Sequence, residues 1–190
     1  SLTTNSNGNN VAIGYQAAKS TNGARNVAIG AASLLANVNG IQNTAIGDNA
    51  LSSVTSNGNT ALGYQAGSNL TAAANNIIIG YQAEASAVTA QNQIVIGQGA
   101  VGVADNSVVI GNSSIVKTIL KGSVGVGTDD PQSKLQVDGG IQLAGDSDTA
   151  SALKVGTFRY RTSGNNSYVD MCMQTGATTY AWINIVQNNW

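Results

Sequence analysis

A short apolar run that ends in glycine recurs along the first 115 residues of the chain. It occupies residues 10–14, 26–30, 43–47, 59–63, 76–80, 93–97 and 107–111. Successive motif glycines are 16, 17, 16, 17, 17 and 14 residues apart. Repeats of this length are too short for a helix pair or a propeller blade, but they fit one coil of a parallel β-solenoid. The pattern predicts about seven coils, each stacked about 4.8 Å above the last.

A second column of small residues supports this arrangement. Three positions after each motif glycine, the chain has Ala17, Ser33, Ala50, Ala66, Ala83, Ala100 and Ser114. We expect this column to belong to a second strand in each coil. Asn-Gly pairs such as residues 22–23 and 57–58 stand between the coils, and such pairs favour a positive φ and a tight reversal.

An asparagine opens the first five copies of the motif. We expect this column to form a hydrogen-bonded amide ladder along the stack. The alternative is a row of exposed amides that bind sugar. The column consists of Asn10, Asn26, Asn43, Asn59 and Asn76.

Alternation along each repeated strand places its first and third residues on one face and its central residue on the other. The central residues are Ala12, Ala28, Ala45, Ala61, Ile78, Val95 and Val109. Both faces read as apolar, so both should be buried, although a thin coil covers only one of them internally. The other face should therefore meet another chain, for which closed cyclic symmetry is the usual solution. The small central residues of the first four coils favour a close approach of strands around an axis.

The pattern changes after residue 115. Residues 116–149 read as a neck, in which Pro131 forces a turn and residues 134–137 resume strand alternation. Residues 150–190 form a third region with three alternating segments, 156–162, 167–174 and 179–186, separated by turns. This predicts an antiparallel β-meander that is too small to be stable alone. Three copies packed around an axis would share a core.

Aromatic residues concentrate in this last region: Phe158, Tyr160, Tyr168, Tyr180, Trp182 and Trp190. Alternation predicts an apolar face made of Val169, Met171, Met173, Ala181, Ile183 and Ile185. The opposite face mixes aromatic and polar side chains, and Tyr and Trp are favoured at interfaces and stack on sugars. We therefore predict a receptor-binding surface there, formed by Tyr168, Asp170, Tyr180, Trp182, Asn184, Arg159 and Arg161. The alternative is that the aromatic side chains form the core of a trimeric domain.

Composition and charge narrow the classes of function. Of the 190 residues, 9% are charged and the net charge is −1. With so few positively charged residues, the chain cannot form a basic surface that binds nucleic acid. A hydrophobic content of 42% opposes disorder. No apolar run is long enough to span a membrane, so membrane insertion is not expected.

The chain lacks the residue types and motifs that common catalytic sites use. It has no His, and no phosphate loop or zinc-site spacing occurs. We expect no enzymatic activity, no cofactor and no metal site. The pair Asp146 and Asp148 could hold a hard cation, but a polar loop is the simpler interpretation. Cys172 lies in an apolar segment and should be a buried, inert thiol. The chain has no starting Met and no signal peptide, so we expect it to be a fragment of a longer protein.

Two segments resemble known families. Residues 8–115 resemble the head repeats of trimeric autotransporter adhesins, which are left-handed parallel β-rolls of three chains around one axis. The period here, 16 to 17 residues, is longer than in those repeats. Residues 122–137 resemble a linking motif of phage tail fibres, with matches at Val124, Gly125, Gly127, Thr128, Pro131, Lys134, Leu135 and Val137. Residues 156–160 and 182–185 resemble parts of small tip domains of phage fibres.

The resemblance implies a homotrimer of all-β chains. Each chain would have β-roll repeats over residues 1–115, a neck over 116–149 and a β-meander tip over 150–190. It implies the distal segment of a viral tail fibre, located in the virion and extracellular, that attaches to a host cell-surface receptor such as a glycan. The alternatives are a fragment of a bacterial trimeric autotransporter adhesin and a purely structural spacer.

Overall fold

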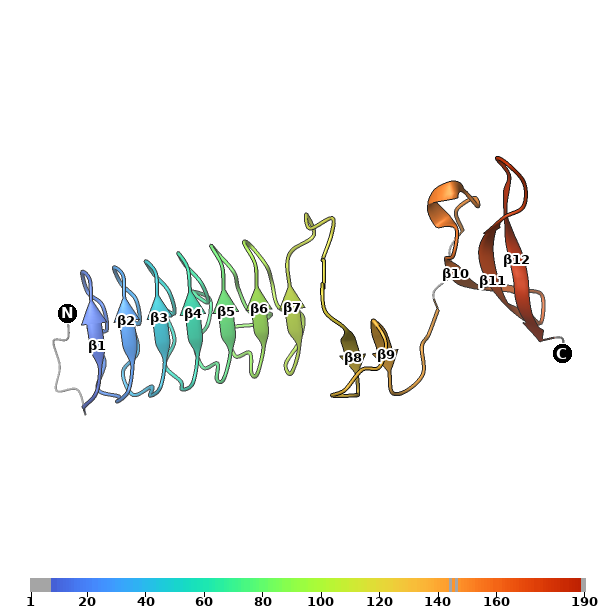
Figure 1. Ribbon diagram of the computed structural model, residues 1–190. Coiled ribbons are helices and arrows are strands. Elements are labelled where there is room, and N and C mark those ends of the chain that lie inside the picture. The colour runs from blue at the N-terminus through green and yellow to red at the C-terminus, as the bar shows by residue number, and fades with distance from the viewer. Residues whose placement is uncertain (1–7, 144, 146, 189–190) are drawn as a thin grey trace. The chain divides into compact units, whose positions relative to one another are not determined.

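The computed structural model describes residues 8–143, 145 and 147–188, and it divides the chain into two compact units (Figure 1). The first unit is Ser1–Thr118 and the second is Ile119–Trp190. In the described part of the chain, the secondary structure consists of twelve strands and one short 3-10 helix. The predicted all-β class is therefore confirmed.

The first unit contains one parallel sheet of seven short strands. They are β1 (Val11–Ile13), β2 (Val27–Ile29), β3 (Thr44–Ile46), β4 (Thr60–Leu62), β5 (Ile77–Ile79), β6 (Ile94–Ile96) and β7 (Val108–Ile110). Each strand pairs in register with the next, so that Ala45 lies between Ala28 and Ala61. Figure 1 shows the strands following one another as successive coils. The predicted parallel β-solenoid is confirmed, with about six turns.

The predicted second strand does not form in the described coils, apart from two isolated bridges. In the first four coils, the residues after the motif glycine form turns instead, because alternate positions have a positive φ. In the first coil φ is 56° at Gln16 and 49° at Ala18, values that an extended strand does not contain. The column of small residues still keeps its register. Ala17 and its counterparts up to Ala100 are buried, whereas Ser114 is exposed.

The interior of the solenoid is filled by the central strand residues and by leucines from the turns. Ala28, Ala45 and Ala61 are fully buried together with Leu34 and Leu51. The expectation that small central residues line an axis between chains is wrong, because they point into the coil of their own chain. The outward face carries the first and third residues of each strand. Among them, Ile13 is 59% exposed, Leu62 is 46% exposed and Ile110 is 65% exposed.

The asparagine column forms the predicted ladder. The Oδ1 atom of each asparagine accepts the N–H of the residue that opens the next motif; the distance from Asn10 Oδ1 to Asn26 N is 2.8 Å, and from Asn26 Oδ1 to Asn43 N it is 2.9 Å. The Nδ2 group donates to a turn carbonyl, as from Asn76 to Ala90 O at 2.8 Å. Asn26, Asn43, Asn59 and Asn76 are fully buried. Exposed, sugar-binding amides are therefore excluded at these four positions.

The motif glycines let neighbouring coils approach each other closely. Gly63 has a φ of 132°, and a Cβ atom placed there would lie 2.6 Å from the carbonyl oxygen of Gly80. The Asn-Gly pairs differ among themselves. Gly58 has the predicted positive φ, 71°, but Gly23 does not. A Cβ on Gly23 would collide with the carbonyl of Gly40, so close packing explains that glycine.

The second unit contains a small parallel pair and a three-stranded sheet. β8 (Val124–Val126) pairs with β9 (Leu135–Val137), and Pro131 lies between them. After the 3-10 helix η1 (Ala152–Lys154), the strands β10 (Phe158–Ser163), β11 (Asn166–Gln174) and β12 (Tyr180–Asn188) form an antiparallel sheet in that order. The predicted meander is confirmed.

One strand face of the meander differs from the prediction. The register between β11 and β12 shifts between Val169 and Asp170, so that Val186 lies opposite Val169 and Asn184 lies opposite Asp170. A β-bulge adds one residue to one strand, and Ile185 has no partner in the ladder. Val186, which the predicted apolar face did not include, thus lies opposite Val169 of that face. Strict alternation fails at the bulge.

The three-stranded sheet buries very little of its surface. Among the described residues of the second unit, only Asp170 and Cys172 are buried. Cys172 is a free thiol, as predicted. The apolar face remains open, with Phe158 47% exposed and Met173 41% exposed.

Candidate functional site

The predicted receptor-binding residues share one face of the three-stranded sheet. Strand pairing sets Arg159 of β10 opposite Asp170 of β11, and Arg161 opposite Tyr168. Across the other edge of β11, Asp170 lies opposite Asn184, and Trp182 lies opposite Cys172. Because side chains two residues apart on a strand point to the same face, the pairing gathers residues from all three strands.

Asp170 is the centre of this cluster. Its side chain is 1% exposed. Its Oδ2 atom accepts hydrogen bonds from Arg159 Nε at 2.9 Å and from Arg161 Nε at 2.6 Å. Its Oδ1 atom accepts weaker ones from Arg161 Nη2 at 3.3 Å and Asn184 Nδ2 at 3.4 Å. One buried carboxylate therefore orients two guanidinium groups and one amide.

Each guanidinium group also covers an aromatic ring. Arg159 Cζ lies 4.2 Å from the ring centroid of Trp182, and Arg161 Cζ lies 3.8 Å from that of Tyr168. These are cation–π distances. Six of the seven predicted residues are thus joined into one group of contacts, which we call the Asp170 cluster: Arg159, Arg161, Tyr168, Asp170, Trp182 and Asn184. The seventh, Tyr180, is half-buried at the start of β12 and takes part in none of these contacts.

The charges in the Asp170 cluster reinforce one another. Burial alone would raise the pKa of Asp170, but hydrogen bonds from Arg161, Arg159 and Asn184, together with the charge of Arg161, outweigh it and lower that pKa below its ordinary value. The hydrogen bond to Asp170 raises the pKa of Arg161. The Asp170 carboxylate and the Arg161 guanidinium group are therefore ionised near neutral pH.

The sequence did not indicate two neighbours of this cluster. Trp182 Nε1 donates a hydrogen bond to the carbonyl oxygen of Asp148 at 3.0 Å, and the carboxylate of Asp148 pairs with Lys154 at 3.0 Å. No pattern in the sequence relates residue 148 to residue 182, because the contact depends on how the segment before β10 folds back. Two predicted residues, Asp146 of the suggested cation site and the aromatic Trp190, lie outside the described residues.

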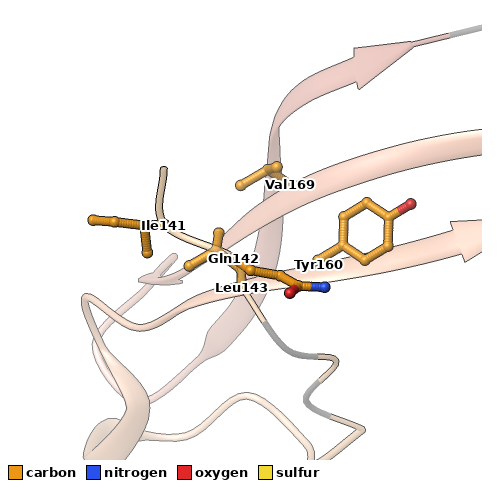
Figure 2. A pocket seen from close by; sticks show the side chains of 5 residues that line it. All are labelled: Ile141, Gln142, Leu143, Tyr160 and Val169. Atoms are coloured by element: carbon orange, nitrogen blue, oxygen red, sulfur yellow. The ribbon is translucent and has the colours of Figure 1, made fainter. Parts of the chain in front are cut away.

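Depressions lie on both sides of strand β10. One of about 530 Å³ lies beside Arg159 and Arg161 and is also lined by Gly145, Ser147, Tyr160 and Thr162. A groove of about 400 Å³ is lined by Tyr160 and Val169 of the sheet and by the segment before it, as Figure 2 shows for Ile141, Gln142 and Leu143. The first depression adjoins the Asp170 cluster, whereas the second belongs to the apolar face.

The comparisons with known proteins identify no relative. No protein family, no curated protein and no solved structure matches the chain. Within the described residues, no group of three or more His, Cys, Asp or Glu side chains is placed to hold a metal ion. The described part of the chain also contains no helix long and apolar enough to cross a membrane.

Proposed function

We propose that this chain is the distal segment of a viral tail fibre, an extracellular part of the virion that attaches to a host cell-surface receptor. The solenoid would be the shaft, and the three-stranded sheet would be the receptor-binding tip. Three copies would assemble around a common axis. The chain would act by binding, without catalysis and without a cofactor.

The observation that carries this proposal is the apolar surface that a single chain leaves uncovered in both units. The outward face of the solenoid exposes Ile13, Leu62 and Ile110, and the tip exposes Phe158 and Met173. Contiguous apolar faces of this kind usually mark an interface. Copies of the same chain supply matching faces, and closed cyclic symmetry satisfies all of them at once.

The Asp170 cluster supplies the binding chemistry on the opposite face of the tip. Its aromatic rings and guanidinium groups are held in place by one carboxylate, and Arg161 and Tyr168 remain partly exposed. Such side chains recur at protein interfaces and suit the ring faces and hydroxyl groups of a glycan. Three weak sites on one trimer would bind a dense cell-surface glycan with high avidity.

Sedimentation velocity tests the assembly. We expect one species with about three times the chain mass of 19.2 kDa. A stable, folded single chain at micromolar concentration would contradict the proposal.

Adsorption to a panel of bacterial cells, with a glycan array beside it, tests the tip. We expect Tyr180→Ala to weaken binding without disturbing the fold, because Tyr180 takes no part in the contacts of the Asp170 cluster. Thr178→Ala, in the exposed turn before β12, is the matched control and should bind normally. If the folded protein adsorbs to no cell and binds no glycan, the spacer alternative replaces the receptor-binding function.

A further inference from the structure

The outward face of the solenoid sheet carries two rows of side chains that run across β1 to β7. The row of third residues is entirely aliphatic: Ile13, Ile29, Ile46, Leu62, Ile79, Ile96 and Ile110. The row of first residues is aliphatic except in β3 and β4: Val11, Val27, Thr44, Thr60, Ile77, Ile94 and Val108. No charged residue occurs in either row. Thr44 and Thr60 therefore form a polar band, two strands wide, in an otherwise apolar face.

The hydroxyl groups of this band have no hydrogen-bond partner within the described chain. Both residues are half-buried, and their neighbours in the row are Val27 on one side and Ile77 on the other. Two other threonines of the solenoid, Thr55 and Thr71, are bonded across coils. Thr55 Oγ1 donates to Thr71 O at 3.3 Å, and Thr71 Oγ1 donates to Val88 O at 3.2 Å.

We propose that the outward face docks a second copy of this chain in register, and that Thr44 and Thr60 fix the register by hydrogen bonding to the same residues of the neighbouring copy. This inference rests on the self-association in the proposed function and adds the surface and the device that aligns the copies.

A second copy is the occupant that the face fits. The rows repeat once per coil, with strands about 4.8 Å apart, and another stack of strands has the same spacing. The polar band is also self-complementary, because each hydroxyl group can both donate and accept a hydrogen bond. A different apolar partner would leave both hydroxyl groups buried without partners, which is unfavourable.

The aliphatic rows alone would not define the register. A slip by one coil replaces isoleucine by isoleucine, leucine or valine at most contacts, so it changes the packing little. The same slip places Thr60 of one copy opposite Thr44 of the next. The remaining Thr44 then lies opposite a valine, Val27. The remaining Thr60 lies opposite an isoleucine, Ile77, so that neither threonine has a polar partner. A single polar position in a coiled-coil core selects register by the same physical effect.

The rest of the chain permits such a slip. Residues 112–123 form no strand or helix, and twelve residues can extend to about 40 Å. A displacement of about 4.8 Å is small beside that length. Association of the tips therefore does not by itself align the solenoids.

Disulfide cross-linking between differently marked chains tests the inference. The background is Cys172→Ala, which removes the one cysteine of the chain. Chains with Ile46→Cys in β3 are co-refolded with chains carrying Leu62→Cys in β4, oxidised, and analysed by mass spectrometry. Copies in register give mainly 46–46 and 62–62 links, whereas a slip by one coil gives mixed 46–62 links.

We expect Thr44→Val with Thr60→Val to raise the ratio of mixed to like links about tenfold, because the penalty for unpaired hydroxyl groups is gone. Thr55→Val with Thr71→Val, which removes two hydroxyl groups from the turns, is the matched control and should leave the ratio unchanged. Thr44→Ser with Thr60→Ser keeps the hydroxyl groups, so the ratio of mixed to like links should stay low. This variant tests the inference even if the valine variant does not fold.

The outcomes separate the two proposals. A trimer whose link ratio is the same with threonine and valine overturns the register device and leaves the proposed assembly intact. A high ratio in the serine variant also overturns the register device. A monomer in sedimentation, without any cross-links, overturns the assembly and the register device together.

Discussion

The solenoid and the three-stranded tip cover their apolar side chains in different ways. Each coil of the solenoid winds back over its own strand, so that Ala45 and Leu51 are fully buried by their own chain. In the described residues of the tip, a single sheet has no second layer over it, so that Phe158 and Met173 remain 47% and 41% exposed. Strands of only three residues can therefore have a hydrophobic core when the chain winds back over them. A single sheet of longer strands needs a second layer to cover its apolar face.

The polar interiors of the two regions differ as well. The solenoid buries neutral amides in a ladder that runs from coil to coil, whereas the tip buries the carboxylate of Asp170 between two arginines. A neutral ladder does not titrate, and an ion pair does. The two regions should therefore respond differently to substitution and to pH, as the predictions below specify in order of decreasing effect.

The largest effect should come from the close approach between coils. We expect Gly63→Ala to destabilise the solenoid by about 4 kcal/mol, because a side chain there combines an unfavourable φ with a collision against Gly80. Urea unfolding followed by far-UV circular dichroism, at fixed protein concentration, measures it. Gly99→Ala is the control. Its φ of 56° matches that of Gln65 and nothing lies within 4 Å, so a loss similar to that of Gly63→Ala would refute the explanation.

In the tip, Asp170→Asn should cost about 3 kcal/mol, because it removes the carboxylate from two arginines that remain in place. Both tryptophans of the chain lie in the second unit, so urea unfolding followed by tryptophan fluorescence reports on this region. Asp148→Asn removes a carboxylate that is 73% exposed and should cost less than about 1 kcal/mol. Equal losses in the two variants would mean that the buried position of Asp170 does not matter.

In the solenoid, Asn59→Ala should cost about 2 kcal/mol, because it leaves the buried N–H of Asn76 and the carbonyl of Ala73 without partners. Asn57→Ala is the matched control. Asn57 is exposed and accepts one hydrogen bond from Ile41 N at 2.8 Å, so the loss should be about half as large. Circular dichroism during urea unfolding measures both. If Asn57→Ala lowered the free energy of unfolding as much as Asn59→Ala does, the asparagine ladder would not explain the loss of stability.

The smallest effect should be an opposite response of the two regions to acid. Burial raises the pKa of Glu84 in the solenoid above 4.5, so the folded solenoid binds a proton more tightly than the unfolded chain and gains stability as the pH falls from 7 toward 4.5. The pKa of Asp170 lies below 3.8, so the tip loses stability only below about pH 4, as that carboxylate becomes protonated.

Urea midpoints measured between pH 7 and pH 3, by circular dichroism for the solenoid and by fluorescence for the tip, test this response. Glu84→Gln should abolish the gain in stability that the solenoid shows as the pH falls. Asp170→Asn should abolish the loss of stability that the tip shows in acid. If both midpoints fall together from pH 7, the assignment to these two carboxyl groups is wrong.

The solenoid could be predicted from the sequence because every coil repeats the same sequence pattern. The repeated glycines fix the strand positions, and the asparagine column indicates the ladder. The turns were harder to predict, because Gln16 and Ala18 adopt a positive φ that their residue types do not signal. Stacking against the neighbouring coil imposes that conformation, and such a contact is not readable from local sequence.

For the candidate site, alternation placed the side chains on the correct face up to the bulge. It did not reveal that Asp170 would be buried between two arginines, nor that Asp148 would receive the hydrogen bond from Trp182. Both contacts depend on which strands become neighbours and on the path of a loop. Alternation also did not reveal the bulge that sets Val186 opposite Val169.

The stacking of one motif glycine on the next has a consequence for how this molecule can evolve. A coil needs only the coil above it and the coil below it, and all of them present nearly the same surfaces. Recombination between repeats can therefore lengthen or shorten the solenoid by about 4.8 Å per copy without redesigning any contact. The length of the solenoid can thus change in a single genetic event, while the three-stranded sheet is inherited unaltered.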